Sequence, residues 1–180
     1  MKYIVLLRGI NISGKNKIVM SELKNALELN NYRNVVTYLN SGNVILESND
    51  SKEYIANNII KIIKNNYKMD IPVFVMSEDE LEDILDNKPD WWGTNNKEIY
   101  DNLIFIMSPC SCEEVCSVVG LPSDGIDKIK KYKNSIFWSF DLKNYRKSNW
   151  WIKTASSSIK DNITIRTANT MKKLMEICNK

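Results

Sequence analysis

The fold is set by the segment Tyr3-Ile-Val-Leu-Leu7-Arg8-Gly-Ile-Asn-Ile-Ser-Gly-Lys-Asn-Lys17, an apolar run followed by a small basic loop. Tyr3–Leu7 is predicted to be a strand, and a helical pattern begins near Met20. The intervening loop holds two glycines and three cations. Such a loop at the end of a strand brings main-chain N–H groups and positive charge to one point. Arg8–Lys17 is therefore a candidate anion receptor.

The remainder of the first half predicts the order βαββαβ. Its strands are expected at Tyr3–Leu7, Val35–Leu39, Val44–Glu47 and Ile71–Met76, and its helices at Met20–Asn30 and along the stripe Ile55, Ile59, Ile62 and Ile63. Asp50 or Ser51 is expected to cap the second helix. Ser77 with Glu80 forms a capping box that opens a short acidic helix.

The second half repeats this order without a visible sequence repeat. Strands are expected at Asn102–Met107, Ile126–Tyr132, Ile136–Phe140 and Ile163–Arg166, and helices from Ser111 to Val118, around Tyr145–Ala155 and after Thr167 or Asn169. We therefore predict an α+β fold: two ferredoxin-like βαββαβ subdomains packed together, with an extra C-terminal helix. The expected boundaries are 1–88 (with the acidic helix), a tryptophan-containing linker at 89–99, and 100–180.

This topology brings two distant segments together. In a βαββαβ unit the first and second strands are parallel, so the loop after one and the turn after the other lie at the same edge of the sheet. We predict that they line a basic ligand-binding cleft formed by Arg8, Asn11, Gly14, Lys15, Asn16, Lys17, Tyr38, Asn40, Ser41, Gly42 and Asn43. Alternatively, the glycines only shape a tight loop, and Asn40–Asn43 is an ordinary hairpin turn.

Composition narrows the chemistry further. The 180-residue chain contains no histidine, so imidazole bases and histidine metal sites are excluded. Four cysteines without paired spacing favour free thiols and a cytoplasmic location, and we expect no metal and no cofactor. No apolar run is long enough to cross a membrane.

Gly9–Lys15 fits the P-loop spacing, but Asn16 stands where a magnesium-binding Ser or Thr is needed.

Several of these motifs together resemble an uncharacterised bacterial family, domain of unknown function 1697. The resemblance covers essentially the whole chain and is carried by Leu6–Asn11 with Gly14–Lys17, Tyr38–Val44, Trp91-Trp92, Ile136–Trp138 and Ile163–Thr170. It implies paired ferredoxin-like subdomains and no particular activity. The family commonly shows Thr-(Val/Ile)-Arg-Asn near the end, and Thr167 replaces that Asn here.

Three kinds of function fit these residues. The first is binding of a phosphorylated ligand, either a nucleotide or single-stranded nucleic acid. Lys128–Lys153 holds eight cations among seven aromatic residues, which suits a single strand, although alternating aromatics also suit a core. The second is a metal-independent enzyme on a small anion, with Arg166 as a further anion contact and Cys112 as a weak candidate nucleophile.

The third is a structural or partner-binding protein, with the pairs Trp91-Trp92 and Trp150-Trp151 exposed as anchors. Alternatively, each pair places one ring in the core between the two halves.

Overall fold

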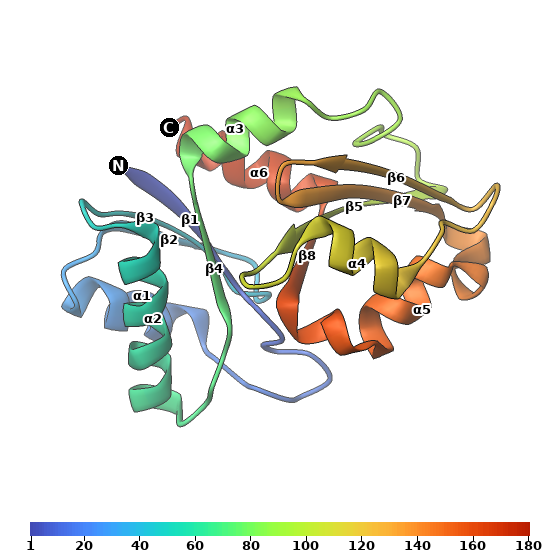
Figure 1. Cartoon of the computed structure of the whole chain (residues 1–180). Coiled ribbons are helices and arrows are strands. Elements are labelled where there is room, and N and C mark those ends of the chain that lie inside the picture. The colour runs from blue at the N-terminus through green and yellow to red at the C-terminus, as the bar shows by residue number, and fades with distance from the viewer. The chain divides into compact units, whose positions relative to one another are not determined.

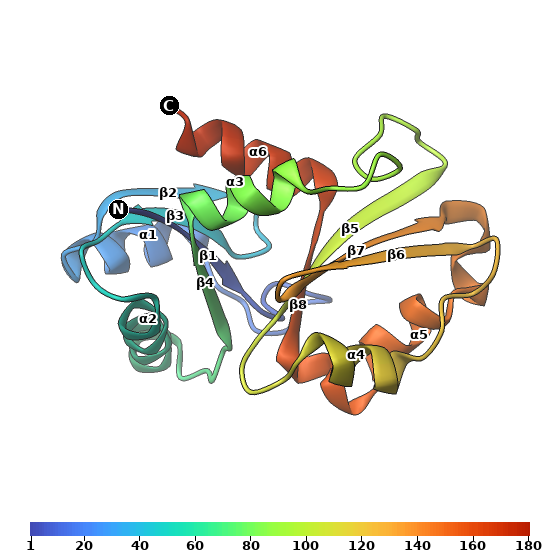
Figure 2. The ribbon, with the colours of Figure 1, turned by 45° about the horizontal axis from the view of Figure 1, so that its top comes forward.

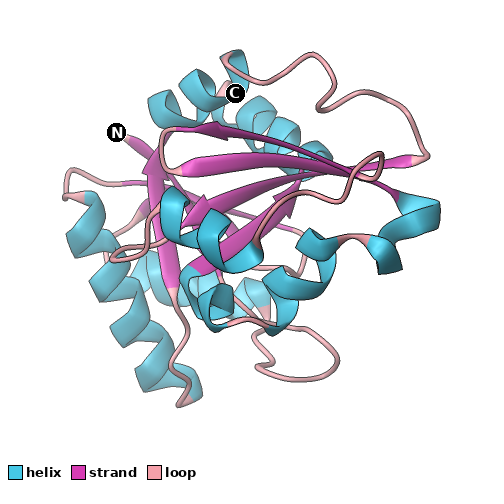
Figure 3. Cartoon of the chain, turned by 45° about the vertical axis from the view of Figure 1, so that its right-hand side comes forward, coloured by secondary structure: helices cyan, strands magenta, loops and turns pink.

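The computed structural model describes residues 1–180, and the chain divides into two compact units. The first unit comprises Met1–Asp83 with Leu174–Lys180, and the second comprises Ile84–Lys173. Each unit contains one four-stranded antiparallel sheet (Figure 1). Each unit combines helices with its sheet, and Figure 3 distinguishes the two kinds of element by colour. The segment 89–99 lies within the second unit.

The first unit has the βαββαβ order that the sequence predicts. Its elements are β1 (Lys2–Leu7), α1 (Met20–Leu29), β2 (Arg33–Tyr38), β3 (Asn43–Glu47), α2 (Lys52–Tyr67) and β4 (Val73–Ser77), followed by α3 (Glu78–Asp86). The strands lie in the order β2-β3-β1-β4, and β1 pairs antiparallel with both β3 and β4. This is the strand order of a ferredoxin-like sheet, and it makes β1 and β2 parallel.

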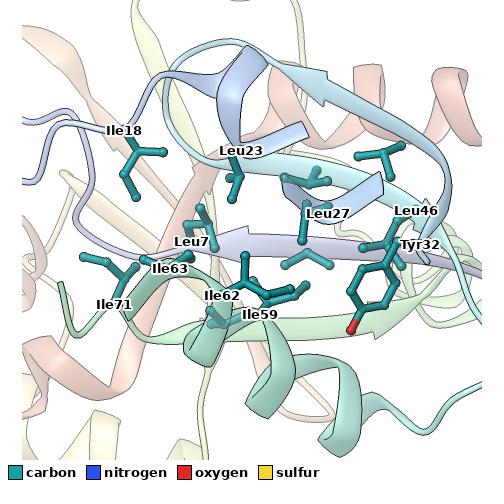
Figure 4. Packing of buried hydrophobic residues seen from close by; sticks show 14 of the residues in the cluster. Leu7, Ile18, Leu23, Leu27, Tyr32, Leu46, Ile59, Ile62, Ile63 and Ile71 are labelled. Carbon is teal, nitrogen blue, oxygen red and sulfur yellow. The ribbon is translucent and has the colours of Figure 1, made fainter. Parts of the chain in front are cut away.

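The core of the first unit lies between its sheet and helices α1 and α2. Val5 and Leu7 of β1 point to the same face because side chains alternate along a strand. They pack with the leucines of α1 and the isoleucines of α2 in one buried cluster (Figure 4). Ser51 caps α2 by accepting a hydrogen bond from the Tyr54 N–H, which settles the choice between Asp50 and Ser51.

The second unit repeats the same strand order. Its elements are β5 (Ile99–Ile106), α4 (Cys112–Val119), β6 (Asp127–Tyr132), β7 (Ser135–Asp141), η1 (a 3₁₀ helix, Leu142–Lys147), α5 (Asn149–Ser156), η2 (a 3₁₀ helix, Ser158–Asn162) and β8 (Ile163–Thr167). Helix α6 (Ala168–Cys178) follows, and its residues from Leu174 on belong to the first unit. The strands lie in the order β6-β7-β5-β8, and α4 and α5 cover one face of the sheet (Figure 2). The α+β fold with two similar halves is confirmed.

The helix predicted around Tyr145–Ala155 is interrupted at Ser148. The Ser148 N–H donates to the Tyr145 carbonyl and closes η1, while the Ser148 hydroxyl accepts from the Trp151 N–H and opens α5. A serine in extended conformation satisfies an otherwise unpaired N–H at a helix start, which favours a new helix over a continuous one.

Each tryptophan pair buries one ring. The Trp92 indole N–H donates to the Asn102 carbonyl at 2.7 Å, and its ring packs edge-on against Phe137. Trp150 lies on the buried face of α5, whereas Trp91 is half-buried and Trp151 is exposed. One ring of each pair is thus in a core, as the alternative to exposed anchors predicts, and both buried rings pack against residues of the second unit.

A buried carboxylate joins the sheet of the second unit to α5. Asp127, 8% exposed, accepts hydrogen bonds from the Trp138 indole N–H at 3.0 Å and the Ser148 hydroxyl at 2.5 Å. Its other oxygen accepts from the Ser123 N–H at 3.0 Å. One side chain thus fixes the edge strand β6, the central strand β7 and the start of α5.

Replacing this carboxylate should weaken the second unit. Asp127→Ala leaves three donors without their acceptor, and we expect it to lower the free energy of unfolding by about 3 kcal/mol. Urea denaturation followed by tryptophan fluorescence measures the loss. Asp124→Ala, on the exposed loop three residues earlier, is the matched control and should change little. Equal stability of the two variants would contradict the structural role of Asp127.

Candidate functional site

The loop after β1 is held in the core at both ends. Ile10 and Ile18 are 2% and 3% exposed and belong to the hydrophobic cluster of the first unit. Figure 4 shows Ile18 pointing into that cluster beside Leu23. All residues of 12–17 between them are exposed. The polar tip therefore projects into solvent from two fixed ends.

The side chain of Asn11 closes this loop. Its Oδ1 accepts from the Ile18 N–H at 2.9 Å, and its Nδ2 donates to the Ile18 carbonyl at 2.9 Å. The same Nδ2 donates to the Asn40 carbonyl at 2.7 Å, which ties the loop to the turn after β2. Asn16 adds a second closure, because its Nδ2 donates to the Gly9 carbonyl at 2.9 Å.

The tip of the loop is a small hairpin. The Lys15 N–H donates to the Ile12 carbonyl at 2.9 Å, and Ser13 and Gly14 between them have φ of +48° and +78°. Positive φ at both central positions is the geometry of a type I′ turn. No hydrogen bond within the protein uses the main-chain N–H groups of Ser13, Gly14, Asn16 or Lys17, and neither Lys15 nor Lys17 pairs with a carboxylate. The tip therefore offers several donors and two ammonium groups to solvent.

The turn 40–43 is seated against the end of β1. The Gly42 carbonyl accepts from the Leu7 N–H at 2.8 Å, and Gly42 has a φ of +80°. A Cβ at this position would lie 2.6 Å from the Cβ of Leu7, so only glycine fits. Buried Asn43 donates from Nδ2 to the Tyr38 carbonyl at 2.9 Å and to the Ser41 hydroxyl at 3.0 Å. Asn40 and Ser41 remain exposed.

The loop and the turn therefore meet at the edge of the sheet where the topology places them. Asn11, Asn16, Gly42 and Asn43 hold the backbone, and the residues that face solvent are Gly14, Lys15, Lys17, Asn40 and Ser41. Tyr38 and Arg8 are half-buried, and the Arg8 N–H donates to the Pro72 carbonyl at 3.0 Å. Binding of a ligand by these residues stays a prediction.

Arg166 lies in the second unit and is 9% exposed. Its Nη1 donates to the Thr164 hydroxyl at 3.0 Å and to the Ile165 carbonyl at 2.9 Å. Burial lowers the pKa of this guanidinium to about 10, which leaves it charged at neutral pH. Its role as a further anion contact also stays a prediction.

Sequence reasoning missed what holds the loop in place. Ile10 and Ile18 were not singled out, although apolar residues on both sides of a polar loop are a sign of anchoring in the core. The hydrogen bond from Asn11 to Asn40 has no local signal, because its partners are far apart in the sequence. The P-loop interpretation remains disfavoured, since Lys15 sits on a hairpin tip and both sheets are antiparallel.

The cysteines of the second unit are poorly suited to nucleophilic chemistry. Burial, with a smaller contribution from Glu113, raises the pKa of Cys112 to about 11, although Cys112 begins a helix. The Cys112 thiol donates to the Lys133 carbonyl at 3.2 Å, which also favours the protonated form. Burial likewise raises the pKa values of Cys110 and Cys116.

No group of three or more His, Cys, Asp or Glu residues is arranged to hold a metal ion. None of the helices combines the length and apolarity of a membrane span.

The fold and this loop define a two-unit α+β protein in which a ferredoxin-like sheet occurs twice. A family described as "Protein of unknown function (DUF1697)" matches residues 1–137, and the chain belongs to that family. The match includes both the loop and the turn, and it confirms the resemblance inferred from their motifs.

The whole chain is also similar to a solved structure described as that of a conserved bacterial protein from Streptococcus pneumoniae. The two are 28% identical with a TM-score of 0.85, and the similarity covers 98% of this chain and 97% of the other. None of the curated proteins matches.

Gly42→Ala tests how closely the turn approaches β1. The new methyl group would collide with Leu7 at a positive φ, so we expect a loss of about 2–5 kcal/mol in unfolding free energy. Gly14→Ala is the control: it also has a positive φ but open space around it, and should cost about 1–2 kcal/mol. Thermal and urea unfolding measure both, and similar losses would contradict the close contact.

Asn11→Gly tests the closure of the loop while keeping a residue that tolerates the φ of +54°. Loss of the amide removes the acceptor of the Ile18 N–H, and we expect this N–H to exchange with deuterium faster by about tenfold. Hydrogen exchange read by NMR measures the effect. Asn25→Gly, on the exposed face of α1, should leave Ile18 unchanged. Unaltered exchange in Asn11→Gly would show that the side chain does not close the loop.

Alkylation with iodoacetamide tests the state of Cys112. Its pKa of about 11 leaves little thiolate at pH 8. Iodoacetamide should therefore modify Cys112 much more slowly in the folded chain than in the urea-unfolded chain. The rate should rise with pH up to about 11, because deprotonation is the limiting requirement. The folded state holds this proton more tightly than the unfolded state, so its contribution to stability falls as the pH rises above 9. Peptide mass spectrometry follows each thiol, and equal rates in folded and unfolded chains would contradict the raised pKa.

Proposed function

We propose that the first unit binds a phosphorylated small molecule on the surface formed by 12–17 and 40–41. The observation that carries the proposal is the Asn11 side chain, which fixes the basic tip to the turn at Asn40. Donors that are already held in place lose little entropy when a ligand binds. The tip is therefore organised before any ligand arrives.

The available groups suit a phosphate. Lys15 and Lys17 lack carboxylate partners, so their charge is not neutralised within the protein. Lysine binds phosphate as a point charge, and main-chain N–H groups in left-handed turns form concave anion sites. A phosphate accepts through several oxygens and uses such a set of donors more fully than a single carboxylate does. In this proposal the exposed side chains of Asn40 and Ser41 hydrogen-bond the remainder of the ligand.

The same residues favour binding over catalysis. Neither 8–17 nor 40–43 contains a carboxylate, a histidine or a cysteine that would act as a general base. No aromatic side chain occurs in either segment, so the proposed contact is with a phosphate group and not with a base. We place this function in the cytoplasm, because all four cysteines are free thiols and a reducing compartment keeps them so.

Isothermal titration with pyrophosphate and with a mononucleotide tests the proposal. We expect saturable binding, a higher melting temperature with ligand, and affinity that Lys15→Ala lowers by roughly tenfold, because a hydrogen bond to a charged group contributes about 1.5–3 kcal/mol. Lys61→Ala, an exposed lysine on α2, removes the same charge at a distant position and should bind like the unmodified protein. Equal affinities of the two variants, or no binding of either ligand, would overturn the proposal.

A further inference from the structure

The segment Leu142–Lys160 of the second unit contains five cations and no acid, all five of them exposed: Lys143, Arg146, Lys147, Lys153 and Lys160. Lys143 pairs with Glu98 at 2.6 Å, and the other four pair with no carboxylate. An uncompensated positive segment of this kind attracts polyanions. A chain of phosphates therefore complements this segment by charge.

Two aromatic side chains lie among these cations. Trp151 is 42% exposed, and its ring rests against Phe140 and Tyr145 with centroid distances of 5.5 and 5.3 Å. The Arg146 guanidinium lies 5.6 Å from the Tyr145 ring centroid, and its Nε donates to the Tyr145 hydroxyl at 3.0 Å. A cation, a tyrosine and an exposed indole thus form one cluster, and two rings support the indole.

The backbone beneath the cluster is fixed. The Trp151 N–H donates to the Ser148 hydroxyl at 2.9 Å, and Ser148 in turn donates to buried Asp127. The main chain that carries the indole is therefore linked to the sheet through the helix cap. By contrast, Trp138, Phe140 and Trp150 are buried in the core of this unit and have no face available for stacking.

We propose that the cluster of Tyr145, Arg146, Lys147 and Trp151 binds single-stranded nucleic acid. A base stacks on the exposed indole of Trp151, and the neighbouring phosphates contact Arg146 and Lys147. Proteins that bind single strands combine positive charge with exposed aromatic rings, because every base has a face that can stack on a ring. The proposal concerns the second unit alone and does not depend on the phosphate site of the first.

A membrane surface fits this cluster less well. Helix α5 exposes two large apolar side chains, Trp151 and Ile152. Asn149, Lys153 and Ser156, which are also exposed, flank this pair with polar side chains. Binding to a membrane surface scales with the apolar area that is buried, and two side chains supply little of it.

Fluorescence anisotropy with a labelled oligo(dT) of ~12 nucleotides tests this inference, a length within the site sizes of single-strand binders. We expect binding at low salt that weakens as salt rises. Trp151→Ala should reduce the affinity by roughly fivefold or more, and Trp151→Phe should retain most of it, because a phenyl ring still stacks. Arg146→Gln and Lys147→Gln should each lower the salt dependence by about 0.7 in the logarithmic slope.

The matched controls are Leu121→Ala, another exposed apolar side chain of this unit, and Lys61→Gln in the first unit. Both should bind like the unmodified protein, and thermal melts should show that all variants are folded. Should Trp151→Ala fail to fold, the two glutamine variants, which change exposed side chains, decide the question. The proposal is overturned if oligo(dT) does not bind at low salt, if the folded Trp151→Ala variant binds normally, if anionic vesicles bind in place of oligo(dT), or if Lys15→Ala is the variant that abolishes binding.

Discussion

The Asn11 amide makes three hydrogen bonds that carry the geometry of the first unit's loop edge. Two go to the main chain of Ile18 and one goes to the Asn40 carbonyl. A buried strand that ends in a polar loop leaves main-chain groups in need of partners, and one side-chain amide supplies both a donor and an acceptor. Ile10 and Ile18 are buried in the core, so the two ends of the loop that the amide joins are themselves fixed. The exposed tip is thereby kept in one shape.

Asp127 has the corresponding role in the second unit. It accepts from the indole of Trp138, from the cap residue Ser148 and from the main chain of Ser123, so strand, helix and loop depend on a single carboxylate. In both units one buried or half-buried polar side chain links segments that the sequence separates. Low local polarity strengthens such bonds and makes their loss costly. The surfaces proposed for ligands lie next to these two residues and owe their rigidity to them.

Much of the architecture could be predicted from periodicity and turn chemistry. The isoleucine stripe of α2 and the capping box at Ser111 each specify a local structure, and the repeated order then leaves few topologies. The sequence also predicted that the loop and the turn meet, because β1 and β2 are parallel and therefore end at the same edge of the sheet. The sequence did not predict the break at Ser148, since its cap depends on a hydroxyl that donates to the distant Asp127.

The sequence by itself determined the α+β class, the two βαββ patterns, the absence of histidine chemistry and the two glycine-bearing bends, because each depends on neighbours along the chain. Only the tertiary structure decided which polar groups are used internally and which face solvent. Asn11 and Asn43 are occupied by main-chain partners, whereas Lys15 and Lys17 extend outward. It also decided that Trp150 is buried and Trp151 exposed. Adjacent side chains on a helix point about 100° apart, so their burial depends on which side of the helix the sheet lies, and that is fixed by contacts distant in the sequence.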